Sequence, residues 1–279
     1  KVLEMKGITK EFGDLSANNN VDFELFQGEI HGLLGENGAG KSTLMNILYG
    51  LYQPNQGEIH VRGRREIIKS PLEAIDLGIG MVHQHFMLTP THTVTENVLL
   101  GLKSKGFFLP FDSAEKKIMD LSKKYGLQVN PKAKIWQISV GEQQRVEIIK
   151  ALYRDVDILI LDEPTSVLSP QEVNSLFATL RSMVKQGLSI IFITHKLDEV
   201  MQVSDRVTVL RDGKVVGKVK TSDTNKEELA NMMVGRPLIT SFERGSVEAT
   251  KNILEIKNVR AKNDRNLIAL KDISLDIKG

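Results

Sequence analysis

The stretch GENGAGKSTLMNILYG, residues 35–50, decides the expected fold. It matches the pattern G-x-x-x-x-G-K-[ST] of a phosphate-binding loop. An apolar, strand-like run at residues 30–34 precedes the loop and apolar residues at helical spacing follow it, which is the order of strand, loop and helix that the pattern requires. The fixed positions are filled by Gly35, Gly40, Lys41 and Ser42. We therefore expect a nucleoside triphosphate site in an α/β domain.

The chemistry of the loop follows from its residue types. Glycines let backbone N–H groups turn toward phosphate oxygens without a Cβ in the way, and the following helix N-terminus adds unpaired donors and a favourable dipole. Lys41 can neutralise the terminal phosphates, and the Ser42 hydroxyl can ligate Mg²⁺. The alternative is a glycine-rich turn that only joins a strand to a helix, and the matching context weighs against it. The residues expected to bind the nucleotide here are Gly35, Asn37, Gly38, Ala39, Gly40, Lys41, Ser42 and Thr43.

A second stretch, DILILDEPTS at residues 157–166, is a continuous apolar run that ends in two carboxylates. Such a run suits a parallel strand that is buried on both faces. Asp162 at the carboxyl end of this strand would reach the Mg²⁺ ion, and Glu163 would polarise an attacking water. Acidic residues after a strand also commonly cap a helix, but the phosphate loop in the same chain favours the metal and water roles.

Two further residues follow apolar strands. His195 ends the run SIIFITH; a lone histidine is more often a core or surface residue, but this one closes a third buried strand at the edge where open α/β sheets bind ligands, so we expect it to contact the γ-phosphate. Gln84 follows another short apolar strand, between His83 and His85. No further metal-ligand spacing accompanies these two histidines, so we predict no metal site there.

Composition excludes several functional classes. The chain has 279 residues, 41% hydrophobic and 26% charged, which is typical of a globular protein. Lys and Arg number 37 against 35 Asp and Glu, which argues against a generally basic nucleic-acid binder. The apolar runs are far shorter than the roughly 20 residues that cross a bilayer, so we expect no membrane span. The absence of cysteine excludes disulfides and thiolate zinc sites.

The stretch ISVGEQQRVEIIKALYRDVDILILDEPTSVLSPQEV, residues 138–173, resembles the signature-to-Walker B block of ATP-binding cassette (ABC) ATPases. The order of the other motifs is also similar to that family, over residues 2–235. The likeness is strongest to the ATPases of sugar and nucleoside importers. The resemblance implies an α/β fold in which a P-loop NTPase core has an N-terminal antiparallel β subdomain and an inserted helical subdomain, the latter receiving coupling helices of a membrane domain.

The resemblance also implies residue roles. Phe12 would stack on adenine, with a partly buried loop aromatic as the alternative. Ser42, Gln84 and Asp162 would bind the metal, Glu163 would act as general base, and Gln84 and His195 would complete the catalytic set. Ser139 and Gly141 of the signature would contact nucleotide, but in this family they close over the phosphate loop of another cassette. One copy therefore builds two half-sites and completes neither.

The chain departs from the family pattern at two places. The usual L-S-G-G-Q is ISVGE here, with Val140 and Glu142 as the changed positions. From the residues alone, Ser139 and Glu142 form a capping box at a helix start. The second departure is Ser169, where the family usually has aspartate. Ser169 and Glu172 are expected to cap the next helix in the same way, with Pro170 at its first position.

The end of the chain resembles its beginning. Residues 253–257 (ILEIK) correspond to residues 2–6 (VLEMK), and an alternating strand ending in glycine follows in both copies. We predict a first ABC ATPase domain at residues 1–235, a linker at 236–252, and the N-terminal strands of a truncated second ABC domain at 253–279. The alternative is an edge strand of the first domain.

The expected function is an ATP-binding and ATP-hydrolysing subunit, with ATP and Mg²⁺ as cofactors, that powers import of a nucleoside or simple sugar. Expected partners are transmembrane permease subunits, an extracytoplasmic solute-binding protein and a second cassette on the same full-length chain, with no nucleic acid. The expected location is peripheral, at the cytoplasmic face of the cell membrane. A soluble tandem-cassette ATPase acting on the ribosome is the alternative, although such translation factors usually have a longer, basic linker. A DNA-repair cassette would need a long coiled coil, and a non-catalytic cassette would not need intact Lys41, Asp162, Glu163 and His195.

Overall fold

The computed structural model describes residues 1–102, 111–236, 252–262 and 268–278. They belong to two compact units, a large N-terminal one and a small one that contains the last two strands. The predicted linker at 236–252 lies almost entirely outside the described residues, as does Gly279. In the part of the chain that is described, no helix is both long enough and apolar enough to cross a membrane.

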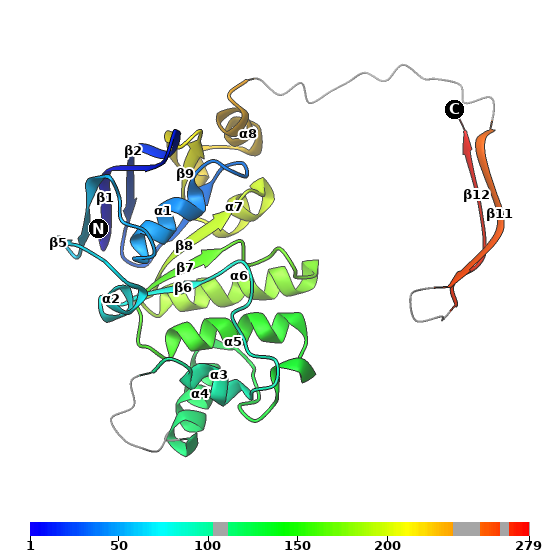
Figure 1. Cartoon of the computed structure of the whole chain (residues 1–279), viewed down its shortest axis with the longest axis horizontal. Coiled ribbons are helices and arrows are strands. Elements are labelled where there is room, and N and C mark those ends of the chain that lie inside the picture. Colours follow the sequence, from blue (N-terminus) through cyan, green and yellow to red (C-terminus); the bar gives the residue numbers. More distant parts are fainter. Residues whose placement is uncertain (103–110, 237–251, 263–267, 279) are drawn as a thin grey trace. The chain divides into compact units, whose positions relative to one another are not determined.

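The large unit is built on a six-stranded sheet in the order β10-β9-β3-β8-β7-β6. Figure 1 labels β9, β8, β7 and β6 of this sheet. Neighbouring strands from β9 to β6 are parallel, and only β10 is antiparallel. Strands β3, β6, β7 and β8 are buried along their whole length, which explains their continuous apolar sequences. The bounds are Ile30–Leu34 (β3), Ile79–Val82 (β6), Ile158–Asp162 (β7), Ser189–Thr194 (β8), Arg206–Arg211 (β9) and Lys214–Lys220 (β10).

A four-stranded antiparallel sheet in the order β2-β1-β4-β5 forms the N-terminal subdomain. Its strands are Leu3–Phe12 (β1), Leu15–Leu25 (β2), Gln56–Val61 (β4) and Arg64–Glu66 (β5). The helices are Lys41–Leu48 (α1), Pro71–Asp76 (α2), Val94–Leu99 (α3), Phe111–Tyr125 (α4), Val140–Leu152 (α5), Pro170–Lys185 (α6), Leu197–Val203 (α7) and Lys226–Val234 (α8). Short 3₁₀ turns occur at Ile135–Gln137 and Thr221–Asp223.

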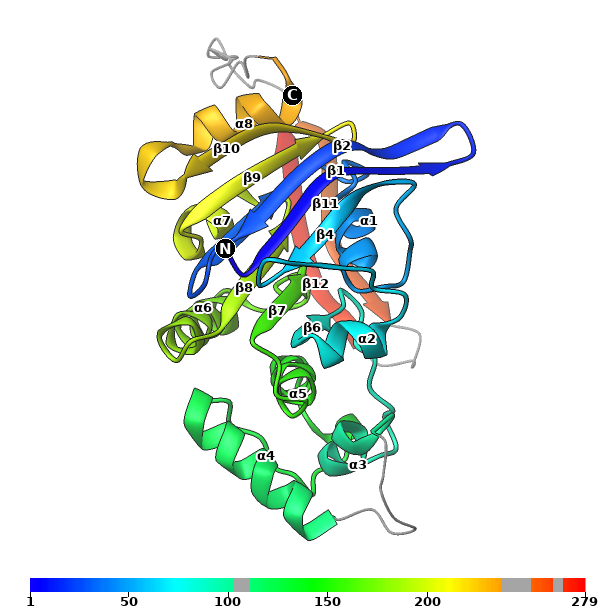
Figure 2. The same cartoon turned by 90° about the vertical axis from the view of Figure 1, so that its left-hand side faces the viewer.

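Two hydrophobic cores lie on opposite faces of the central sheet. On β7, Ile158 and Ile160 pack into the core shared with β1, β2 and α1, whereas Leu159 and Leu161 pack into the core shared with α5 and α6. This alternation is the two-residue period of a strand that is covered on both sides. Figure 2 shows α3 and α4 beyond α5, farthest from the antiparallel sheet. The expected α/β core with its antiparallel N-terminal sheet and helical insertion is therefore confirmed.

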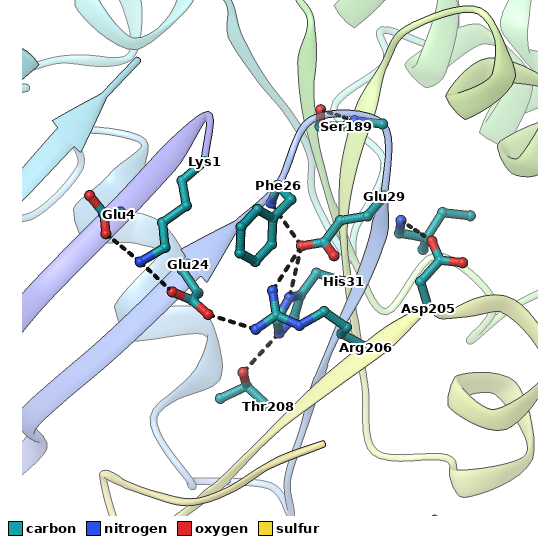
Figure 3. Close-up of polar contacts among 12 residues, drawn as sticks. Lys1, Glu4, Glu24, Phe26, Glu29, His31, Ser189, Asp205, Arg206 and Thr208 are labelled. Atoms are coloured by element: carbon teal, nitrogen blue, oxygen red, sulfur yellow. Dashed lines mark hydrogen bonds and ion pairs between the residues drawn. The ribbon is translucent and has the colours of Figure 1, made fainter. Parts of the chain in front are cut away.

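A polar network joins the antiparallel sheet to the central sheet (Figure 3). Arg206 of β9 donates to Glu24 of β2 at 2.6 Å and lies 3.4 Å from Glu29. The carboxylate of Glu29 accepts from Nδ1 of the fully buried His31 at 3.3 Å, and Nε2 of this ring accepts from the Thr208 hydroxyl at 2.8 Å. Burial lowers the pKa of His31, so the ring is neutral and both of its nitrogens are satisfied.

The small unit is an antiparallel hairpin of β11 (Asn252–Lys262) and β12 (Ile268–Lys278). It repeats the local geometry of the β1–β2 hairpin. Gly7 has φ 58° and its N–H donates to the Asp22 carboxylate at 2.7 Å; at the corresponding place Asn258 has φ 50° and its N–H donates to the Ser274 hydroxyl at 3.0 Å. The same sequence pattern thus produces the same irregularity in both hairpins.

The two hairpins differ in what covers them. The inward residues of β1 and β2 are buried in the first core. The corresponding apolar residues of the second hairpin are exposed in the described structure, namely Leu254, Val259, Ile273, Leu275 and Ile277. An apolar face of this kind needs a covering layer to be stable in water.

Candidate nucleotide site

The phosphate-binding loop joins β3 to α1, as the sequence predicts. Gly40 is the N-cap of α1 and has φ 96°, a left-handed conformation that glycine adopts without steric cost. A Cβ on Gly40 would also collide with the carbonyl oxygen of Ala17, and a Cβ on Gly35 with that of Leu210. Gly40 is therefore required both by the backbone turn and by β2 packed behind it, and Gly35 by the close approach of β9.

Lys41 is buried, with 5% of its surface exposed, and its ammonium group lies on its own loop. Nζ donates to the carbonyl oxygens of Gly35 at 2.8 Å and Glu36 at 2.9 Å. Burial lowers the pKa of Lys41, and the charges of Glu163 and Asp162 act in the opposite direction. The two hydrogen bonds of the ammonium group thus go to neutral carbonyl oxygens, and the negative charges of Glu163 and Asp162 act on it through space. A phosphate anion would add a charged hydrogen-bond acceptor.

Asp162 ends β7 beside the start of α1. Burial raises the pKa of this carboxyl, and a hydrogen bond from Ser42 acts to lower it. A carboxylate and a hydroxyl are oxygen ligands of the kind that Mg²⁺ prefers, so this pair fits the expected ion. Among the described residues, no group of three or more acidic, histidine or cysteine side chains is arranged so that it could hold a metal ion by itself. Phosphate oxygens usually complete the ligand set of nucleotide-bound Mg²⁺.

Glu163 is the centre of a second cluster. Its carboxylate accepts from His195 Nδ1 at 2.8 Å and lies 3.4 Å from Gln84 Nε2. The backbone of Glu163 has φ 46°, an uncommon conformation for a residue other than glycine, and its N–H donates to Ile193 at 3.0 Å. The parallel register explains the convergence, since Leu161 of β7 lies between Val82 of β6 and Phe192 of β8. The three residues follow these strands at the same edge of the sheet.

A cavity of about 630 Å³ connects the loop, the carboxylate and the N-terminal sheet. Phe12 lies at the end of β1 with 43% of its surface exposed and packs edge-on against Tyr52, with ring centroids 5.4 Å apart. The lining residues that the sequence predicts are Phe12, Asn37, Gly38, Gly40, Lys41, Ser42, Thr43, Gln84 and Glu163. Those that it misses are Leu15, Ser16, Ala17, Asp212 and Gly213, which show no motif of their own.

The remaining predicted residues do not line this cavity. Gly35 and Ala39 belong to the rear of the loop. His195 is hydrogen-bonded to Glu163, and Asp162 is hydrogen-bonded to Ser42, so each contacts a residue that lines the cavity. Ser139 and Gly141 lie at the start of α5 and contribute nothing to the cavity. The large unit therefore brings the loop together with Asp162 and Glu163, but not with Ser139 and Gly141.

Both predicted capping boxes are confirmed. The Ser139 hydroxyl accepts from the Glu142 N–H at 3.3 Å, and the Ser139 N–H donates to the Glu142 carboxylate at 2.8 Å. Ser169 and Glu172 make the same reciprocal pair at the start of α6. These bonds lower the pKa of both glutamates. The departures from the family pattern thus have a local structural role as helix caps.

One buried carboxylate near the site has no sequence signal. Glu199 of α7 is 7% exposed and accepts from the hydroxyls of Thr165 at 2.7 Å and Thr194 at 2.9 Å. Lys196 pairs with the same carboxylate at 2.9 Å. Thr165 lies just after Glu163 and Thr194 just before His195 in the chain. Glu199 therefore ties together the two segments that hold these side chains, without lining the cavity itself.

Comparisons with known proteins agree with this geometry. The chain is 53% identical over 278 residues to the nucleoside import ATP-binding protein NupA of Lactococcus lactis, covering 99% of this chain and 55% of that protein. It is 51% identical to the guanosine import ATP-binding protein NupO of Bacillus subtilis, covering 99% and 54%. It is 48% identical to the glucose import ATP-binding protein TsgD13 of Haloferax volcanii, covering 99% and 56%. The chain thus spans about half the length of these relatives.

Solved structures support the same fold. CbiO1 of Clostridium perfringens, part of an ABC transporter complex, has a TM-score of 0.71 at 28% identity, covering 84% of this chain and 94% of that one. A dimeric ATP-binding cassette bound to ADP and Pi has a TM-score of 0.68 at 29% identity, covering 78% and 98%. The family model described as ABC transporter matches residues 18–166. The resemblance expected from the motifs is therefore confirmed, and the chain belongs to the ABC transporter family.

Proposed function

We propose that this chain binds and hydrolyses ATP with Mg²⁺ and, as part of a longer protein, powers the import of a nucleoside or simple sugar. The observation that carries the proposal is the placement of Glu163 at the edge of the cavity formed by the phosphate-binding loop, held between His195 and Gln84. Membership of the ABC transporter family and the import names of its relatives support the same conclusion.

Different residues of the cavity would bind different parts of the nucleotide. The Phe12 ring lines one part of the cavity and would stack on a base, and the N–H groups around Gly38 and Gly40 would bind the phosphates. The Lys41 ammonium would exchange its two loop carbonyls for phosphate oxygens. Ser42, Asp162 and Gln84 would hold Mg²⁺, which supplies charge neutralisation of the phosphate oxygens when bound.

Glu163 would take the proton from an attacking water. His195 donates to one carboxylate oxygen at 2.8 Å and therefore fixes the direction of the group. In its expected role His195 would also contact the terminal phosphate. The Gln84 side-chain nitrogen lies 3.4 Å from the other carboxylate oxygen of Glu163 and is placed to orient the same water.

We also propose that a second cassette completes the site. Ser139 and Gly141 lie outside the cavity, at the N-terminus of α5, where the helix dipole favours an anion. Within the longer protein, this end would face the phosphates bound by the other cassette. The repeated bulge geometry of the β11–β12 hairpin supports its assignment to that cassette, with residues 1–235 as the first domain, 236–252 as linker and 253–279 as its first strands.

The partners follow from the same assignment. A groove of about 350 Å³ lies between α2 and α5, with Leu51, Leu72 and Met87 exposed along it. The charged side chains of Glu147 and Lys150, which also line this groove, would fix the direction of a docked helix. We propose that permease subunits dock here, that an extracytoplasmic solute-binding protein delivers the cargo to them, and that the chain is peripheral at the cytoplasmic face of the membrane.

Nucleosides are the preferred cargo, since the relatives at 53% and 51% identity have nucleoside and guanosine import names. The relative at 48% identity has a glucose import name, so a simple sugar is the second candidate for the cargo. The relatives compared above have import names and none has a ribosomal one, so they give the translation-factor alternative no support.

Two experiments test the proposal. Titration calorimetry of the 279-residue chain with Mg-ADP should show uptake that Lys41→Ala abolishes, with thermal unfolding as the folding control. The full-length protein purified from membranes should retain permease subunits and hydrolyse ATP, and Glu163→Gln should bind nucleotide but turn over at least about 100-fold more slowly. Purification with ribosomes instead of permeases, or undiminished turnover in the Glu163→Gln variant, would contradict the assignment.

A further inference from the structure

Asn18 of β2 is a polar residue at a fully buried position. Its amide Nδ2 donates to the carbonyl oxygen of Gly40 at 3.1 Å. Its Oδ1 is buried and has no hydrogen-bond partner among the described residues. An unpaired buried acceptor lowers stability, and leucine has the same number of side-chain atoms without that cost. The chain therefore accepts an energetic penalty at this position, which is common where a residue has a functional task.

The bond from Asn18 acts on the peptide group that starts α1. The Gly40 carbonyl oxygen also accepts the Leu44 N–H at 3.0 Å, the first bond of the helix. Because a trans peptide is planar, its C=O and the following N–H point in opposite directions. Two donors on the Gly40 oxygen therefore fix the direction of the Lys41 N–H. That direction is away from the helix and toward the loop, where a phosphate would bind.

The neighbouring residues hold the same part of the loop from behind. The Asn19 N–H donates to the Gly213 carbonyl at 2.8 Å, and the Gly213 N–H donates to Ala39 at 3.3 Å. The Ala17 carbonyl lies so close to Gly40 that no Cβ fits between them. Residues of β2 and of the turn between β9 and β10 thus clamp the rear of the loop.

Asn18 does not line the nucleotide cavity, although Ala17, Gly40 and Gly213 do. We propose that Asn18 is a positioning residue of the phosphate-binding loop: its amide sets the Gly40–Lys41 peptide in the orientation that nucleotide phosphates need. The proposal rests on the proposed nucleotide binding in this cavity. Without the amide, the peptide would have to be ordered when the nucleotide binds, and this ordering would lower the affinity.

The substitution Asn18→Leu separates positioning from packing. The side chain keeps its size, and the Gly40 oxygen keeps its bond from Leu44, so no buried group is left unpaired. The unpaired Oδ1 disappears. We therefore expect the unfolding temperature to stay the same or rise, while Mg-ADP binds about fivefold more weakly, the effect of losing roughly one net hydrogen bond. A purely structural role predicts that both quantities fall together.

Asn18→Asp is the second variant. It keeps the shape but replaces the donor by a carboxylate oxygen facing the Gly40 oxygen, and it adds negative charge behind the phosphates. We expect a larger loss of affinity than in Asn18→Leu. Asn19→Leu is the matched control, because the side chain of Asn19 is exposed and its backbone bond to Gly213 is unaffected.

The test is titration calorimetry of the 279-residue chain with Mg-ADP, paired with thermal unfolding without nucleotide. Weaker uptake in both Asn18 variants, with normal uptake in Asn19→Leu and an undiminished unfolding temperature in Asn18→Leu, would support the proposal. Uptake within twofold of the unsubstituted chain in Asn18→Leu, or parallel losses of affinity and stability, would overturn it. An unsubstituted chain that takes up no Mg-ADP would instead overturn the proposed function, and this inference with it.

Discussion

Replacing Glu199 by glutamine should loosen the two segments that hold Glu163 and His195. The carboxylate accepts three donors, from Thr165, Thr194 and Lys196, at 2.7, 2.9 and 2.9 Å. The glutamine amide has one acceptor oxygen and no charge. At least one of the three interactions is therefore lost, and the others become weaker. A hydrogen bond to a charged group contributes about 1.5–3 kcal/mol against about 0.5–1.5 for a neutral one. We expect a loss of about 2 kcal/mol in the free energy of unfolding.

For a domain of this size that loss corresponds to an unfolding temperature about 4–8 °C lower. Scanning calorimetry of the 279-residue chain measures it, with Glu227→Gln as the control because Glu227 is exposed on α8. Nucleotide affinity should stay within about twofold, since Glu199 does not line the cavity, while turnover of the full-length protein should fall. An unfolding temperature within about 1 °C of the unsubstituted chain would refute the reasoning, because the network would then contribute nothing to holding these segments.

Three further predictions concern the site itself. Burial raises the pKa of Asp162, so the folded chain binds this proton more tightly than the unfolded chain, and stability should decrease as pH rises from about 3.8 through the raised pKa. Asp162→Asn should therefore unfold at a higher temperature at pH 7 and lose the Mg²⁺ dependence of nucleotide binding; an unchanged midpoint in thermal scans would speak against the burial penalty. Phe12→Ala should weaken Mg-ADP binding by roughly 5- to 100-fold, while Phe12→Trp should retain it, because stacking contributes about 1–3 kcal/mol per base; equal affinities in calorimetry would exclude stacking. Gln84→Ala in the full-length protein should lower turnover, because Gln84 lies 3.4 Å from the Glu163 carboxylate, and should weaken the binding of Mg-nucleotide, because Gln84 is one of the proposed Mg²⁺ ligands; undiminished turnover in steady-state kinetics would contradict this.

Features encoded by neighbouring residues could be predicted from the sequence. The loop from Gly35 to Ser42 is defined by glycines that permit its turns and by the strand and helix on either side of it. The capping boxes at Ser139 and Ser169 depend on a partner three residues later in the same turn of chain. Buried parallel strands are continuous apolar runs, so the positions of Asp162, Glu163 and His195 at one sheet edge followed from the pattern.

Contacts between distant segments could not be predicted in this way. Asn18 meets Gly40 and Glu199 meets Thr165 only because separate strands and helices pack together, and neither residue belongs to a short motif. The sequence by itself determined the chemical groups, the fold class and the helix starts, because those depend on local conformational preference and on periodic burial. Only the tertiary structure decided which buried polar groups are paired, that Lys41 lies on its own loop, and that the signature lies outside the cavity. The physical reason is that hydrogen bonding and desolvation of a buried group depend on neighbours brought together by packing, and no spacing along the chain encodes them.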